Sequence, residues 1–160
     1  MLTTAEFLLT TGIYTSVTIA SNLIRSVTYL MSIAHSDNEL KNLLITSDVL
    51  EDLGVIKVFI EEQKHRDNIP ASISVCIENL NTVLIQLEDN LNSITNKIQT
   101  HHQKYFNYFR SYNIGEEKKK IPILIEKMHH RFDLLIKINQ NHNFKMSATD
   151  HYEHKLITNF

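Results

Sequence analysis

Two Glu-x-x-His sequences are the part of the chain whose residue types could do metal chemistry. They are Glu62 with His65, and Glu126 with His129. Di-iron carboxylate bundles use two such motifs on helices that face the bundle axis at the same depth. The apolar spacing of Ile56 and Ile60 instead directs Gln63 toward a core. The two motifs would also differ in level by ~15–20 Å at 1.5 Å per residue. We therefore expect solvated helix surface at both.

Two histidine pairs, His101–His102 and His129–His130, are a second candidate for metal or proton chemistry. If their helices are antiparallel about a turn at 112–115, the pairs lie at similar heights, which allows a metal site or a pH-sensitive contact. Adjacent histidines point to different sides of a helix, which favours ordinary surface positions. The chain has no Gly-rich phosphate loop, no Cys/His zinc spacing and no nucleophile with its base. We expect no enzymatic activity, no metal and no cofactor.

Basic residues gather in the second half of the chain. The formal net charge is -2, but residues 1–96 hold 5 basic and 12 acidic groups, whereas 97–137 hold 9 basic and 4 acidic. The candidate lipid contacts near an expected turn are Lys97, Lys104, Arg110, Lys118, Lys119, Lys120, Lys127 and Arg131. Each basic group close to an anionic membrane contributes about 1 kcal/mol. A solvated helix end is the alternative, and the modest excess argues against nucleic acid as a partner.

Long helices must position these groups, because glycine (3) and proline (2) are scarce. The strongest signal is a heptad seam of Ile73, Ile77, Leu80, Leu84, Leu87, Leu91, Ile94 and Ile98. A second seam comprises Ile121, Ile125, Met128, Phe132 and Leu135, and a third comprises Ile45, Val49, Leu53, Ile56 and Ile60. Seams of this spacing are typical of helices that pack along their length. Ser36 or Asp37 is available as an N-cap, and Pro70 suits a first helical turn.

These patterns predict an all-α fold, an antiparallel up-down four-helix bundle over residues 1–140. The expected helices span about 4–35, 38–67, 70–110 and 116–141, and Pro122 indicates a start near Lys120 or an irregular first turn. Residues 141–160 are expected to be a polar tail with a possible short, brace-like helix from Thr149 to Ile157. The single Cys76 excludes an internal disulfide framework.

The segment from Glu6 to Arg25 holds no charged residue between its ends. Its apolar residues follow the same alternating spacing, namely Ile13, Val17, Ala20, Ile24, Val27, Met31 and Ala34, and Leu23 with Leu30 widens the stripe. The segment contains too many hydroxyl and amide groups for a membrane-spanning helix. It also lacks the basic residues at its start that a secretory signal requires. We expect a buried first helix whose uncharged outer face is covered by another segment, a partner or a lipid.

Four segments together carry a resemblance. They are "TGIYTSVTIASNLIRSV", "ELKNLLITSDVLEDLGVIKVFIEE", "IPASISVCIENLNTVLIQLEDNLNSI" and "LIEKMHHRFDLLIKINQ". In order and length they resemble the N-terminal four-helix bundle of the mixed lineage kinase domain-like family, related to fungal HeLo and plant RPW8-type domains. The resemblance implies a cell-death or immune executioner that binds anionic lipids through basic residues, forms homo-oligomers and permeabilises membranes. It also implies a regulatory protein partner and relocation from the cytoplasm to a membrane.

Under this resemblance the first helix, with Ile13, Val17, Ile24 and Val27, is the element that inserts into the membrane. A helix without charge has a lower barrier to entering a bilayer, where each central charge costs at least about 2.5–3.5 kcal/mol. In the family a brace helix follows the bundle; here we expect residues 147–158 to serve as the brace, without the kinase that follows in the family. Two alternatives stay open: an adaptor or oligomerisation bundle that binds a partner helix, and a metal bundle built on the paired histidines.

Overall fold

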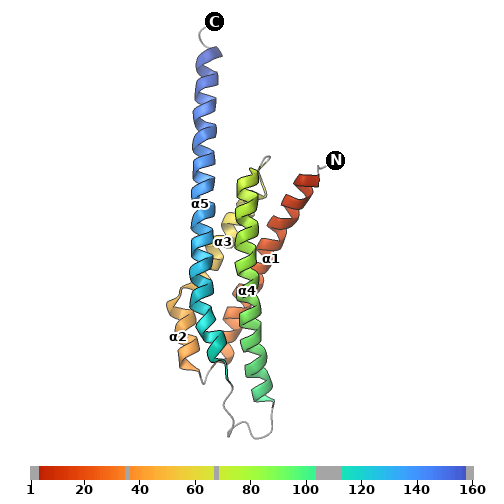
Figure 1. Cartoon of the computed structure of the whole chain (residues 1–160), viewed down its shortest axis with the longest axis vertical. Helices are drawn as coiled ribbons and strands as arrows, with labels where there is room; N and C mark the ends of the chain where they lie inside the picture. The colour runs from red at the N-terminus through yellow and green to blue at the C-terminus, as the bar shows by residue number, and fades with distance from the viewer. Residues whose placement is uncertain (1–3, 35–36, 67–68, 104–112, 158–160) are drawn as a thin grey trace.

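The protein is described by a computed structural model that covers residues 4–34, 37–66, 69–103 and 113–157, with side chains placed over 12–34, 37–66, 69–103 and 113–144. These residues form five α-helices and no strand, which confirms the all-α prediction (Figure 1). The helices are α1 (Thr4–Ile33), α2 (Asn38–Thr46), α3 (Val49–Gln63), α4 (Ala71–His102) and α5 (Gly115–Ile157).

Helix α1 packs on one side against both α3 and α4. Its composition permits this, because small buried residues such as Ser16 and Ala20 let neighbouring helices approach closely. The buried stripe is centred on Leu23, Val27 and Leu30 rather than on Ile24 and Met31, which are only partly buried. The predicted stripe is therefore present but rotated by about one residue around the helix axis.

The prediction of a single helix over 38–67 is wrong, because this segment forms two helices, α2 and α3, with a break between them. Asp48 has φ 49°, in the left-handed region that aspartate tolerates better than most residues. The break lets Leu44 and Val49, five residues apart, both face the core, whereas Ile45 is 49% exposed. The expected N-cap is confirmed, since the Asp37 carboxylate accepts a hydrogen bond from the Leu40 backbone N–H at 2.9 Å.

Helix α4 confirms the long heptad seam. All eight predicted seam residues are at most 2% exposed, and Pro70 stands as the N-cap just before the first turn. The helix ends at His102, so it is shorter than the predicted 70–110, and residues 104–112 lie outside the described part of the chain. Lys104 and Arg110, two predicted lipid contacts, fall in that segment.

Helix α5 is one continuous element from Gly115 to Ile157, which corrects the expected break at 141–148. The chain has no glycine or proline after Pro122, so nothing there forces a turn. The segment is polar, but even its asparagines each cost less than about 0.7 kcal/mol in a helix. Pro122 lies inside the helix on its exposed side, not at its start. In Figure 1 the C-terminal part of α5 extends past the ends of the other helices.

The predicted core face of α5 is confirmed. Ile121, Ile125, Met128 and Leu135 are at most 5% exposed, and Phe132 packs against the same core. With the seam of α4 and the stripes of α1 and α3, these residues form one hydrophobic cluster.

Contacts between distant residues give the helix directions. The Asn81 Nδ2 donates to Gly12 O at 3.5 Å and the Gln99 Nε2 to Tyr29 Oη at 2.8 Å, so α1 and α4 run parallel. Asp52 lies beside His129 and Phe59 beside Phe132, so α3 and α5 also run parallel. Helices α4 and α5 run in opposite directions along each other (Figure 1).

Along the chain α1, α3, α4 and α5 therefore alternate in direction, and the two parallel pairs join helices that are not consecutive. The largest backbone contacts are α4 with α5, α1 with α4 and α1 with α3, whereas the consecutive helices α3 and α4 are not among the extensive pairs. The charge-poor, small-residue surface of α1 provides the physical reason, because it can pack between α3 and α4 and keep them apart.

Candidate functional site

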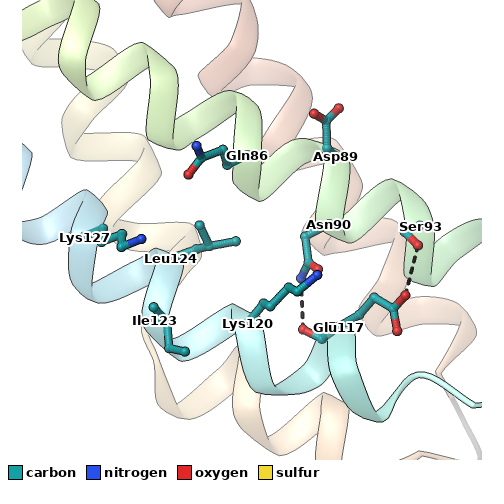
Figure 2. A pocket seen from close by; sticks show the side chains of 9 residues that line it. All are labelled: Gln86, Asp89, Asn90, Ser93, Glu117, Lys120, Ile123, Leu124 and Lys127. Carbon is teal, nitrogen blue, oxygen red and sulfur yellow. Dashed lines mark hydrogen bonds between the residues drawn. The ribbon is translucent and has the colours of Figure 1, made fainter.

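A shallow groove runs between α4 and α5. It contains two hollows of about 460 and 410 Å³ that share Gln86 and Lys127. Helix α4 contributes amides and hydroxyls such as Asn79, Thr82 and Ser93, while α5 contributes cations and the apolar Ile123 and Leu124. Figure 2 shows the first hollow, with Lys120 and Lys127 on one side and Gln86 and Asp89 on the other.

Glu117 fixes one end of the groove. Asn90 Nδ2 donates to its backbone carbonyl at 3.0 Å and Ser93 Oγ to its carboxylate at 3.2 Å (Figure 2), while Lys97 Nζ lies 2.6 Å from the same carboxylate oxygen. The Lys97 hydrogen bond is the main reason why the pKa of Glu117 is lowered from its usual value. The network joins α4 to the first turn of α5.

Three of the predicted lipid-contact cations are paired with carboxylates inside the protein. They are Lys97 with Glu117, Lys118 with Asp37 and Glu39, and Lys119 with Glu116. The hydrogen bond to Glu39 is the largest cause of a raised pKa at Lys118, whose side chain is 20% exposed. Because these charges are partly neutralised, they offer less attraction to an external anion than their number suggests.

Lys120, Lys127 and Arg131 form a different group. All three are exposed and border the groove, and none forms an ion pair with another described residue. Asp89 and Glu126 line the same hollows without pairing to them. We call Lys120, Ile123, Lys127, Arg131 and Leu134 the basic face of α5; Ile123 is 52% and Leu134 38% exposed. Among the predicted lipid contacts that the structure describes, Lys120, Lys127 and Arg131 are therefore the ones whose charge is not paired within the described part of the protein.

The metal hypotheses gain no support. As expected, Gln63 is buried while Glu62 and His65 are exposed. His129 Nε2 lies 2.6 Å from an Asp52 carboxylate oxygen, which ties α5 to α3. Among the described residues no group of three or more His, Cys, Asp or Glu side chains is placed to hold a metal ion.

The expectation that the histidine pairs lie at similar heights is wrong. His130 borders the hollow beside Asn79, whereas His101 and His102 end α4. The separation of 22 residues along α4 corresponds to roughly 33 Å at 1.5 Å per residue. Glu117 lies beside Asn90 and Ser93, so the last turns of α4, with His101 and His102, extend beyond the first turn of α5.

The four residues predicted to insert into a membrane all lie on α1. Ile13 and Val27 are at most 3% exposed, and Val17 and Ile24 are partly buried against the core. No helix in the described ranges combines the length and the apolar content that crossing a bilayer requires.

Sequence reasoning missed Asn90 and Glu117. Asn90 is only 8% exposed, and it occupies the position seven residues after Val83, where a buried apolar residue is expected. A polar residue in such a register position is the signal that would have indicated a polar contact between helices.

Comparison with known proteins gives no family. No family model matches the chain, and no solved structure matches it. An uncharacterized protein of Acanthamoeba polyphaga mimivirus is 34% identical over 90 residues, which cover 56% of this chain and 44% of that protein. The chain therefore aligns with less than half of the length of this relative.

Proposed function

We propose that the chain is a non-enzymatic four-helix-bundle protein that binds anionic membranes, oligomerises and permeabilises them, as a cell-death or immune executioner does. In this proposal α2 and α3 together act as one element of the bundle. The protein moves from the cytoplasm to a membrane, where the basic face of α5 meets lipid phosphates and α1 inserts at the interface. The observation that carries the proposal is the chemistry of α1.

Many hydroxyl side chains of helix α1 form hydrogen bonds within the helix. Five hydroxyls donate to backbone carbonyls three or four residues earlier, at 2.6–2.9 Å: Ser16, Thr18, Ser21, Thr28 and Ser32. A hydroxyl that keeps such a bond loses less free energy when water is removed than one bonded only to water. Arg25 is the single charged residue among the described side chains of α1. Its outer face is therefore unusually suited to a medium without water.

Interfacial insertion, with the helix lying in the plane of the headgroups, fits α1 better than spanning. Its apolar stripe is interrupted by polar groups, and interfacial helices bury only one face. The stripe that would enter the acyl region is the one that packs on α3 and α4 in the folded protein. Insertion therefore requires α1 to leave those helices first.

The test is dye release from phosphoinositide-containing liposomes by wild type and by Thr18→Lys/Thr28→Lys. Both threonines are exposed, so the folded protein tolerates the lysines, but two added charges oppose removal of the outer face of α1 from water as the helix enters the headgroup region. We expect binding to remain and leakage to fall at least tenfold.

The matched control is Thr46→Lys/Thr100→Lys. These threonines are also exposed, but they lie on α2 and α4 and line neither hollow of the groove. We expect this variant to leak dye like wild type. If wild type releases no dye even at high protein concentration, the proposal is overturned. If dye release falls equally in the test variant and the control variant, α1 is not the inserting element.

A further inference from the structure

Helix α3 carries an exposed acidic and apolar row that nothing in the described chain covers. Glu51, Val55, Val58 and Glu62 are spaced four, three and four residues apart and form what we call the acidic face of α3. All four are exposed, with Val55 at 54% and Val58 at 55%. Neither glutamate forms an ion pair with a described residue. Two half-exposed valines between two free carboxylates are typical of a helix face that packs on another helix.

The basic face of α5 has the same construction with the opposite charge. Ile123 lies between Lys120 and Lys127, and Leu134 follows Arg131. The acidic face spans about 17 Å and the basic face about 21 Å at 1.5 Å per residue, so each can cover most of the other. The groove beside the basic face also contains Asp89 and Glu126, so its charge is mixed, as in a protein interface.

The two faces do not meet within one molecule. His129 and Phe132, which lie on the α3 side of α5, contact Asp52 and Phe59. Lys120, Lys127 and Arg131 instead border hollows shared with α4. The complementary faces therefore lie on different sides of α5, where a second molecule can reach each of them.

We infer that the acidic face of α3 on one copy docks against the basic face of α5 on a second copy of this chain. Val55 and Val58 then pack beside Ile123 and Leu134, and the glutamates approach the three cations. The contact is heterologous, because it joins two different patches, so each copy keeps one free face and the assembly can grow. Salt weakens it, since exposed charges are screened beyond about 10 Å at 0.1 M.

The contact also regulates the proposed lipid site, and this part alone rests on the proposed function. A docked copy covers Lys120, Lys127 and Arg131, the cations that lipid phosphates would otherwise reach. Anionic membranes and a second copy then compete for one face, so self-association in solution withholds the protein from membranes.

A charge exchange, followed by sedimentation velocity from low to high micromolar concentration, tests the contact. Glu51→Lys/Glu62→Lys makes both faces basic, and Lys120→Glu/Lys127→Glu/Arg131→Glu makes both acidic. Each variant alone should associate about tenfold or more weakly than wild type, because like charges then face each other. An equimolar mixture of the two should regain association, because each supplies the face that the other lacks. Circular dichroism and thermal melts verify that both variants are folded.

Glu78→Lys/Asp133→Lys, which changes the net charge by the same amount as Glu51→Lys/Glu62→Lys but at exposed positions outside both faces, is the control and should associate like wild type. A wild type that stays monomeric, or a mixture that fails to associate while the control does, overturns the inference. Liposome flotation separates this result from the proposed function. If wild type binds membranes but stays monomeric, the docking contact is wrong and the proposed function is unaffected. If it self-associates but does not bind membranes, the docking contact is supported and the proposed function is wrong.

Discussion

Helix α5 is held on its two sides in different ways. Toward α4 the backbones are in extensive contact over an apolar seam, and the Glu117 network closes the end. Toward α3 the backbone contact is slight, and long side chains bridge the gap: Phe59 to Phe132, Asp52 to His129, and Arg66 to Asn139 at 2.6 Å. The free energy of unfolding should therefore be concentrated on the α4 side, and the α3 side is where α5 can separate at the lower cost.

The largest effect is expected from disrupting the apolar seam of α4. Leu87 is 1% exposed in the middle of the α4 seam, so Leu87→Ala removes buried methyl groups and leaves a cavity. We expect the free energy of unfolding to fall by about 2–5 kcal/mol, measured by urea denaturation followed by circular dichroism. Val75→Ala, on the same helix but 54% exposed, is the control and should change it by less than about 0.5 kcal/mol. Equal effects at both positions would contradict the placement of the seam.

A smaller effect is expected on the α3 side. The rings of Phe59 and Phe132 meet edge to face with centroids 5.5 Å apart. Phe132→Leu keeps most of the apolar volume but loses the ring contact, so we expect a loss of about 1–1.5 kcal/mol. A double-mutant cycle with Phe59→Leu isolates the pair and should give a coupling energy of about 0.5–1.5 kcal/mol. Zero coupling would show that α3 and α5 are not joined there.

The contrast between the α4 side and the α3 side of α5 also explains which parts of the fold follow from the sequence. The α4 seam is regular over more than three heptads, so helix type, face and burial all follow from spacing alone. The contacts toward α3 depend on single pairs such as Asp52 with His129, far apart in sequence, which no periodicity indicates. Periodicity also does not indicate the break at Asp48. This residue adopts a left-handed backbone conformation although no glycine or proline marks the position, and the apolar spacing continues through it from Ile45.

The candidate site was predicted in part. The sequence located the excess of cations but could not separate those already paired, such as Lys118 with Asp37, from those that are free, such as Lys127. Pairing depends on which helix lies beside α5, and that is set by the packing of α1 between α3 and α4. The continuity of α5 through 141–148 has a simpler explanation: a polar composition by itself does not end a helix, and no residue in that segment is a helix breaker.

The smallest effect is expected from the Glu117 network, the polar contact between α4 and the first turn of α5. Glu117→Gln removes the ion pair with Lys97 but keeps a group that can accept from Ser93. Because Lys97 is 44% exposed, solvent screens the pair, and we expect a loss of only about 0.5–1 kcal/mol at pH 7. The folded state lowers the pKa of Glu117 below 4.5, so its contribution is complete above that pH and disappears as the pH falls through the lowered value.

The difference in unfolding free energy between wild type and Glu117→Gln should therefore shrink toward zero on acidification below pH 4.5, as measured by urea denaturation across that range. Asp133→Asn, which removes an exposed carboxylate that pairs with no described residue, should show no comparable change. A difference that stayed constant with pH would mean that the amide disturbs packing instead of a charge. The polar network would then hold the end of α5 by shape, and the two sides of the helix would differ only in apolar contact.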